Sequence, residues 1–166
     1  MKNELIIILL VMISPAISCN HGPAEKDATN SHKLVGTWRL LEYTDFDTAT
    51  GKATHPYGEH PKGYFTYTKS GIVNLNISAE KSIVVPTDSV YTRQFSLGAL
   101  LDNACGYFGT YTIDDKNSVV THHVKGGSVL DYIGTDQRRH FMLRGDTLLI
   151  GDPEFKTGKR VLVREE

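Results

Sequence analysis

Short runs of alternating apolar and polar residues follow one another along most of this 166-residue chain. The clearest run is 72–77, where Val73, Leu75 and Ile77 occupy every second position and asparagines lie between them. Such alternation predicts a strand with one buried face, because successive side chains on a strand point to opposite sides. Comparable runs at 34–43, 63–68, 106–113, 118–125, 137–143, 147–150 and 160–164 predict further strands.

Turn residues separate these runs at short intervals. Residues 69–71, 114–117 and 144–146 each predict a tight connection between two neighbouring strands. Sequential hairpins predict an all-β fold, an antiparallel up-and-down barrel of about eight to ten strands, and closing the sheet also removes its exposed edges. Residues 91–104 have a weak helical pattern, interrupted by Gly98, and predict one short helix.

The N-terminal residues 1–19 predict a secretory signal peptide, since Lys2 precedes an apolar run at 5–13 and small residues lead to Cys19. The apolar run is about half as long as a membrane-spanning helix. Residues 16–19 resemble the bacterial lipobox, in which the cysteine is lipidated and becomes the new N-terminus. An ordinary signal peptide with an incidental cysteine is the alternative.

Residues 20–33 are polar and aperiodic, which predicts a flexible tether, and 34–166 then form one domain. The expected location is the cell envelope, reached by export and held only by a lipid anchor. Asn20 is not the Asp often associated with inner-membrane retention, so the outer membrane is favoured. With Cys19 lipidated, Cys105 has no partner and is expected to be a small buried side chain; a Cys19–Cys105 disulfide is the alternative.

Net charge is −1 and no basic cluster stands out, so nucleic acid is not an expected partner. The adjacent His122 and His123 point to opposite faces of a strand and do not converge on one ion. No other cysteine or histidine cluster has the spacing of a zinc site. We therefore expect neither a metal nor a cofactor.

The same alternation assigns side chains to the barrel interior. His122 shares a face with Val120 and Val124, whereas His123 shares a face with Lys125, a residue that is seldom buried. Inward arginines require an acceptor or an anionic ligand. The candidate ligand-binding residues on inward faces are Tyr67, Tyr107, Tyr111, His122 and Arg139. The alternative is that these groups satisfy one another and hold no ligand.

Gly36, Thr37 and Trp38 resemble the G-x-W signature of lipocalins and related calycin barrels. In those barrels the tryptophan closes one end beneath an arginine from the last strand, a position that Arg164 matches. The runs "LVGTWRLLEY", "PKGYFTYTKSG", "YFGTYTID", "VTHHV" and "GTDQRRHFML" together resemble the bacterial and fungal lipocalin-like domain family over 34–164. The resemblance implies a calycin-type barrel with an internal cavity and no particular activity.

These features predict an envelope lipoprotein that binds a small hydrophobic or amphipathic molecule in its lumen. One alternative is an isomerase or cyclase that uses His122 as a base and Arg139 or Tyr111 to stabilise an oxyanion. Another is a structural lipoprotein that binds a protein partner. The turn-rich segment with His55 and Tyr57 is either a surface loop or a cover over the barrel mouth. The sequence leaves the oligomeric state open.

Overall fold

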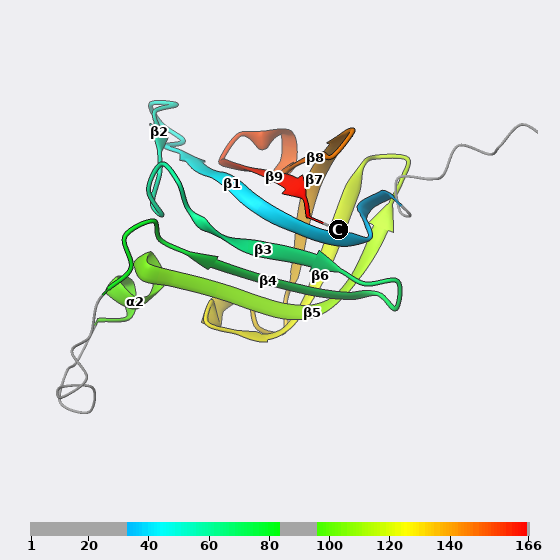
Figure 1. The fold of residues 1–166 in the computed structure, drawn as a ribbon, viewed down its shortest axis with the longest axis horizontal. Coiled ribbons are helices and arrows are strands. Elements are labelled where there is room, and N and C mark those ends of the chain that lie inside the picture. Colours follow the sequence, from blue (N-terminus) through cyan, green and yellow to red (C-terminus); the bar gives the residue numbers. More distant parts are fainter. Residues whose placement is uncertain (1–32, 84–95, 166) are drawn as a thin grey trace, which may run out of the picture.

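Within the described residues, nine antiparallel strands follow one another along the chain and form one continuous sheet (Figure 1). The computed structural model describes residues 33–83 and 96–165. The predicted signal peptide, the predicted tether up to residue 32 and the predicted helical residues 91–95 lie outside this part of the chain.

The strands are β1 (Gly36–Phe46), β2 (Ala53–Thr54), β3 (Lys62–Tyr67), β4 (Ile72–Ser78), β5 (Ala104–Asp114), β6 (Val119–Gly127), β7 (Asp136–Arg144), β8 (Thr147–Gly151) and β9 (Gly158–Arg164). A helix, α2 (Leu97–Asn103), precedes β5. Two 3-10 turns, η2 (Leu130–Tyr132) and η3 (Pro153–Phe155), precede β7 and β9. In the described residues, α2 is the one short helix that the sequence predicts.

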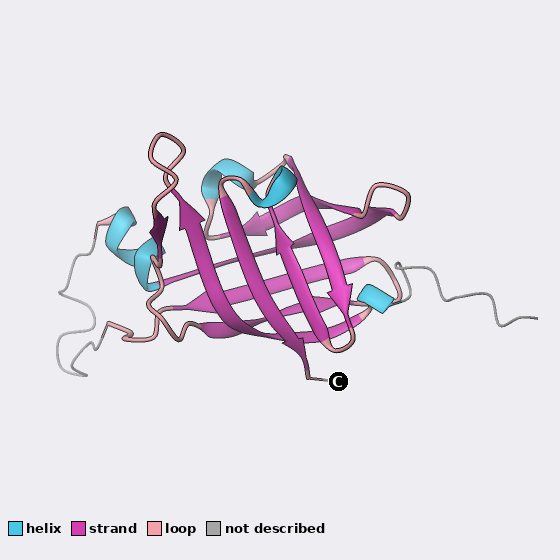
Figure 2. Cartoon of the chain, turned by 90° about the horizontal axis from the view of Figure 1, so that it is seen from above, coloured by secondary structure: helices cyan, strands magenta, loops and turns pink. Residues whose placement is uncertain are grey.

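β1 pairs with both β3 and β9, and this double pairing closes the sheet into an eight-stranded barrel. Trp38 on β1 lies opposite Phe65 on β3 and Arg164 on β9. β2 is a short addition beside the end of β1. Figure 2 shows two layers of strands that cross, with the helical turns at their ends. The predicted antiparallel up-and-down barrel is confirmed.

Strand alternation fills the barrel interior. On β4, Val73, Leu75 and Ile77 are buried, while the residues between them are exposed. Leu148 and Ile150 on β8 are buried in the same way. Each such side chain contributes about 1.5–3 kcal/mol when it is fully buried, so the apolar interior stabilises the closed sheet.

A β-bulge in β1 changes which of its residues face inward. Trp38 and Leu40 are buried, and simple alternation would continue inward with Glu42 and Thr44. The pairing with β9 shifts between Leu40 and Glu42, because a bulge inserts one extra residue into one strand. Beyond the bulge it is Tyr43 that lines the interior cavity, while Thr44 is buried outside the cavity wall.

Trp38 lies at the barrel end where β1 begins. Its side chain is completely buried, and its indole Nε1 donates a hydrogen bond to the carbonyl oxygen of Leu34 at 2.8 Å. Gly36, two residues earlier, has a φ of 141°, a conformation that residues with a side chain rarely adopt. The glycine therefore lets the chain enter β1 with the indole turned inward.

Arg164 covers the indole from β9. Its Cζ lies 4.1 Å from the centroid of the Trp38 ring. The guanidinium also donates to the carbonyl oxygens of Val35, at 2.9 Å, and Lys33. A cation over an aromatic face adds electrostatic attraction to the apolar contact. This end of the barrel is thus held by side chains from the first and last strands.

Within the described residues, the helix α2 spans Leu97–Asn103, inside the 91–104 pattern that predicts it. The hydroxyl oxygen of Ser96 accepts a hydrogen bond from the backbone N–H of Ala99 at 3.1 Å and caps the helix. Gly98, which we expected to interrupt the pattern, lies inside the first turn. Within 33–83 and 96–165, no helix has the length and apolar character needed to cross a bilayer.

β6 extends beyond its predicted end. The sequence predicts a strand over 118–125, but Gly126 and Gly127 also pair with β5, and Gly127 lies opposite Tyr107. A Cβ atom at position 127 would lie 2.6 Å from the Cα atom of Tyr107. Only glycine permits this close approach. Because Gly127 has no side chain, the strand pairing can continue through this position.

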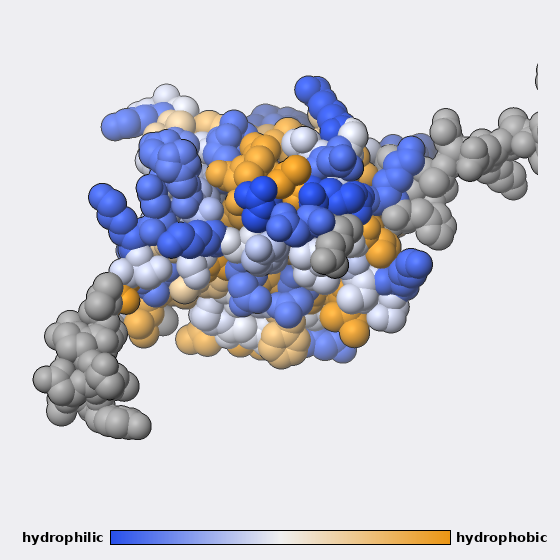
Figure 3. Space-filling model, in the orientation of Figure 1, coloured by the Kyte–Doolittle hydropathy of each residue, from blue (hydrophilic) through white to orange (hydrophobic). Residues whose placement is uncertain are grey.

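The face of the molecule seen in Figure 3 is mainly hydrophilic, with apolar side chains among the polar ones. Exposed large apolar side chains include Leu41, Tyr64 and Met142. Exposed apolar side chains are ordinary in folded proteins, because polar groups do not suffice to cover a domain.

We predict that Trp38→Ala lowers the free energy of unfolding by about 3–5 kcal/mol, because it leaves a cavity beneath Arg164. Urea denaturation followed by circular dichroism measures this change. Tyr64→Ala is the matched control, since that aromatic side chain is 46% exposed on the outside of the barrel. A Trp38→Ala loss no larger than the control's would show that the indole does not hold this barrel end.

Candidate functional site

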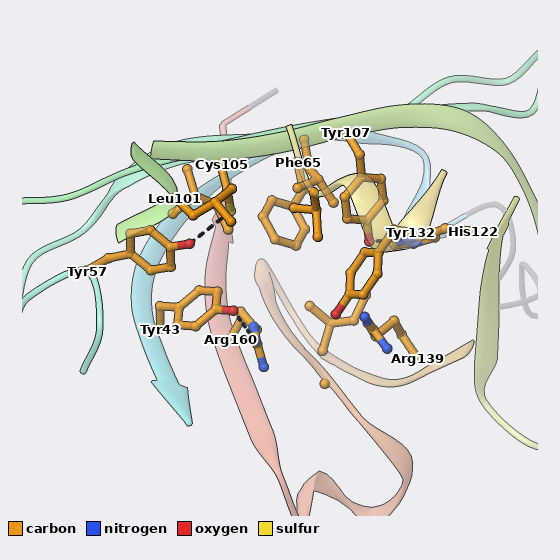
Figure 4. Close-up of a pocket in the computed structure, with 15 residues that line it drawn as sticks. Tyr43, Tyr57, Phe65, Leu101, Cys105, Tyr107, His122, Tyr132, Arg139 and Arg160 are labelled. Carbon is orange, nitrogen blue, oxygen red and sulfur yellow. Dashed lines mark hydrogen bonds between the residues drawn. The ribbon is translucent and has the colours of Figure 1, made fainter. Parts of the chain in front are cut away.

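The barrel encloses a cavity of about 190 Å³ (Figure 4). Apolar side chains form much of its wall, among them Phe65, Leu75, Ile77, Leu101, Val129 and Ile150. The remaining wall carries tyrosines, one histidine, one cysteine and two arginines. A mainly apolar wall with a few polar groups is typical of a small-molecule site.

Strand direction places the cavity away from the Trp38 end. Trp38 lies near the beginning of β1, and its partner Arg164 ends β9. Because the two strands are antiparallel, Tyr43 and Arg160 pair with each other farther along, towards the opposite barrel end. Both of these residues line the cavity. The cavity therefore extends from the middle of the barrel towards the end that Trp38 does not close.

His122 lies in the interior, 1% exposed, between two tyrosines. Its Nε2 is 2.9 Å from the hydroxyl oxygen of Tyr67, and its Nδ1 is 2.8 Å from the hydroxyl oxygen of Tyr107. The two phenol rings have centroids 5.6 and 5.8 Å from the imidazole centroid. Both ring nitrogens are thus engaged by phenols that come from other strands.

Burial keeps these three groups uncharged at neutral pH. The pKa of His122 is lowered to about 3, mainly because burial removes water and secondly because the positive charge of Arg139 lies nearby. Burial raises the pKa of Tyr107 to about 12 and holds the pKa of Tyr67 well above its ordinary value. An imidazole with both nitrogens engaged and so low a pKa is a poor general base, which disfavours the isomerase hypothesis.

Arg139 supplies a positive charge near the inner part of the cavity. Its Nη1 lies 3.3 Å from Oδ1 of Asp152, and its Nη2 donates to Oε1 of Gln137 at 3.2 Å. Its Cζ lies 5.8 Å from the centroid of the Tyr132 ring. Asp152 is outside the cavity wall, so the guanidinium faces the cavity while its carboxylate partner lies behind it.

Arg160 supplies a second positive charge, towards the barrel mouth. Its Cζ lies 3.8 Å from the centroid of the Tyr43 ring, and its Nη2 donates to the Tyr43 hydroxyl and, at 3.1 Å, to Oδ1 of Asp45. Arg160 is not among the candidate ligand-binding residues that the sequence predicts. Alternation on β9 contained the signal, because Arg160 shares a face with Leu162 and Arg164.

The segment before β3 contributes to the barrel mouth. The Tyr57 side chain is 8% exposed, its hydroxyl donates to Sγ of Cys105 at 3.0 Å, and its ring packs edge-on against Tyr43 at 4.8 Å. Burial raises the pKa of the Cys105 thiol, so the sulfur stays protonated and is a weak nucleophile. His55 lies outside the wall, with its Nδ1 3.5 Å from the Thr44 hydroxyl.

The structure brings three of the five predicted ligand-binding residues to the cavity wall: Tyr107, His122 and Arg139. Tyr67 does not line the cavity, but its hydroxyl is hydrogen-bonded to His122, which does. Tyr111 pairs with His122 in the sheet register, but its hydroxyl donates to the carbonyl oxygen of Thr68 at 2.7 Å, away from the cavity. Strand alternation identifies the inward face but not the direction of a long side chain.

His123 lies on the outside of the barrel, as the alternation predicts. Its Nδ1 is 2.7 Å from Oδ1 of Asp136, and its Nε2 is 3.1 Å from the Thr112 hydroxyl. The order of the three groups is that of a hydrolytic triad. Here the three side chains lie across the outer face of three paired strands and do not line the cavity.

Several wall residues come from connections and not from the predicted strands. Leu101 belongs to α2, Val129 and Tyr132 belong to the segment between β6 and β7, and Tyr57 precedes β3. Alternation carries no signal for these positions, since it applies only within strands. Among residues 33–83 and 96–165, no group of three or more His, Cys, Asp or Glu side chains is arranged to hold a metal ion.

The low pKa of His122 predicts a pH-dependent stability. Its pKa falls from 6.5 to about 3 on folding, so the unfolded chain binds the extra proton between these values. The free energy of unfolding should therefore decrease as the pH falls from about 6.5 towards 3, by roughly 1 kcal/mol per pH unit from this group. Urea denaturation at several pH values measures the slope.

His122→Gln should make this slope shallower, whereas the outward His123→Gln should retain it. Equal slopes in the two variants would show that His122 is not the neutral buried group.

The sequence profile of the lipocalin-like domain family matches residues 35–160. Two solved structures resemble the chain at 10% identity: a DUF4847 family protein from Bacteroides vulgatus (TM-score 0.39, 78% of this chain and 92% of the other) and a mutant of the fluorescent protein UnaG (TM-score 0.33, 81% and 98%). No curated protein matches the sequence. Because the family profile covers most of the barrel, this chain belongs to the lipocalin-like domain family.

Proposed function

We propose that this protein is an exported envelope lipoprotein whose barrel binds a small amphipathic molecule. The observation that carries the proposal is the cavity inside the closed sheet, which combines an apolar wall with two arginines and several tyrosine hydroxyls. Buried polar groups in an apolar site orient a ligand through hydrogen bonds, while the apolar wall supplies most of the binding free energy. A lipocalin-like barrel is compatible with this role.

The cavity volume limits the size of the ligand. An apolar cavity of about 150 Å³ holds one benzene molecule, whereas sites for larger drug-sized ligands span about 300–1,000 Å³. At about 190 Å³, this cavity suits one ring with a short substituent. The aromatic side chains of Phe65, Tyr107 and Tyr132 provide faces and edges for such a ring.

The N-terminal sequence supports the envelope location. The apolar run at 5–13, the lipobox-like residues 16–19 and the polar segment that follows are the order expected for export, lipidation at Cys19 and a tether. A lipid anchor on this tether would hold the barrel at a membrane surface. Asn20 favours the outer membrane within this proposal.

We predict that the full chain, isolated gently from bacterial envelopes, carries a small molecule detectable by native mass spectrometry. Ile150→Phe should reduce the bound fraction severalfold, because the larger side chain occupies cavity volume. Leu149→Phe is the matched control, since the neighbouring side chain lies on the outer face of β8. A wild-type barrel with no bound molecule, or equal retention in both variants, would contradict a ligand in this cavity.

The proposed anchor predicts a second outcome. The wild-type protein should enter the detergent-rich phase in a Triton X-114 partition, and Cys19→Ser should move it to the aqueous phase because the acylated thiol is lost. Cys105→Ser should partition as the wild type does, since that thiol lies in the barrel. Equal partition of wild type and Cys19→Ser would count against lipidation at this residue.

A further inference from the structure

We infer that Tyr107 holds its hydroxyl hydrogen ready for a ligand, and that Tyr107 and Arg139 together bind the carboxylate of a small aromatic acid. This inference rests on the proposed function, because it names the chemical class of the molecule in the same cavity. It follows from the hydrogen-bond requirements of three interior side chains and from the absence of acidic groups in the described wall.

The hydrogen bonds determine which nitrogen of His122 carries the proton. A neutral imidazole has one donor and one acceptor nitrogen. Among the described residues, His122 Nε2 is the hydrogen-bond partner of the Tyr67 hydroxyl, which is 1% exposed. If Nε2 carried the proton, the Tyr67 hydrogen would have no acceptor, at the cost of an unsatisfied buried donor. Tyr67 therefore donates to Nε2, and the proton lies on Nδ1.

This arrangement leaves the Tyr107 hydrogen available. Nδ1–H of His122 donates to the Tyr107 hydroxyl oxygen at 2.8 Å, so that oxygen acts as an acceptor towards the imidazole. The Tyr107 hydrogen must then point elsewhere, and the cavity adjoins this hydroxyl (Figure 4). Tyr67 thus donates to His122, and His122 donates to Tyr107. The Tyr107 hydroxyl is left as a donor directed at the cavity.

The other polar groups nearby are also donors. Arg139 uses Nη1 and Nη2 for protein acceptors, and a guanidinium has five N–H groups, so donors remain for a ligand. The Tyr132 ring lies near both Tyr107 and Arg139. Its centroid is 5.9 Å from the centroid of the Tyr107 ring and 5.8 Å from Cζ of Arg139. Tyr107 and Arg139 thus belong to one side of the cavity.

The described wall contains two arginines and no aspartate or glutamate. The carboxylates that pair with the arginines, Asp152 and Asp45, lie outside it and are partly exposed. A ligand in this cavity therefore meets donors and few acceptors. A carboxylate matches this set, because its two oxygens accept from a guanidinium and a hydroxyl at once, and the apolar wall accepts a ring.

The test compares phenylacetate with phenylacetamide, which differ only in replacing one carboxylate oxygen with an NH2 group. The full chain, purified in mild detergent, is dialysed to equilibrium against each labelled probe, with the same detergent on both sides. We expect phenylacetate to bind at least tenfold more tightly, because the amide presents a donor to Arg139 and Tyr107. Equal binding of the two probes, or no binding of phenylacetate, overturns the inference.

Variants assign the effect to residues. Tyr107→Phe should weaken phenylacetate binding about tenfold while changing phenylacetamide binding less, and Arg139→Gln should remove most of the preference for the acid. Tyr111→Phe is the matched control, since its hydroxyl is bonded to Thr68 outside the cavity. A Tyr107→Phe variant that keeps the full preference for the acid overturns the role of Tyr107. The circular dichroism spectrum of each variant verifies folding.

Nuclear magnetic resonance tests the tautomer without any ligand. Long-range ¹H–¹⁵N correlation spectra of the labelled chain distinguish protonated from unprotonated ring nitrogens, and comparison with His122→Gln assigns the signals. We expect a proton on Nδ1 of His122 and none on Nε2, and the reverse overturns the directed donor.

A separate result tests the proposed function. A native mass spectrum with no bound small molecule would contradict ligand binding itself. A bound neutral molecule would agree with the proposed function but would overturn the inference that the ligand is an acid.

Discussion

The pairing of β1 with both β3 and β9 is the interaction on which the rest of the structure depends. Closure turns every strand position into either an inside or an outside position. It also sets the two ends of the barrel, because the same antiparallel pair brings Arg164 over Trp38 at one end and Arg160 beside Tyr43 towards the other. One end is filled by a stacked pair, and the cavity lies towards the other.

Closure also governs the chemistry of the interior. Polar groups inside a barrel lose water and must find partners in the wall, or the fold loses free energy. His122 is satisfied by two phenols and remains neutral, while each arginine has an aspartate outside the cavity wall. Within the described residues, no buried side-chain polar atom lacks a hydrogen-bond partner. After these pairings, hydroxyl and guanidinium hydrogens remain at the cavity. A ligand therefore has to supply hydrogen-bond acceptors.

The adjacent histidines illustrate how a closed wall separates similar residues. His122 and His123 are consecutive in the chain, yet one is buried between tyrosines and the other is bonded to Asp136 and Thr112 on the outer face. Their environments differ because a strand directs successive side chains to opposite sides. Barrel geometry thus gives the two residues different surroundings and different hydrogen-bond partners.

The sequence by itself determined the all-β barrel, the order of its hairpins, and the inward direction of His122 and Arg139, because alternation and turn residues are local properties of the chain. The place of Trp38 at one barrel end was implied by the resemblance of Gly36, Thr37 and Trp38 to the G-x-W signature. Only the tertiary structure decided which inward side chains share a cavity. The bulge that turns Tyr43 inward arises from pairing with β9, and the positions of Tyr57 and Tyr132 depend on how connecting segments pack against the barrel. Strand pairing and loop packing join residues distant in sequence, and local patterns carry no record of those contacts.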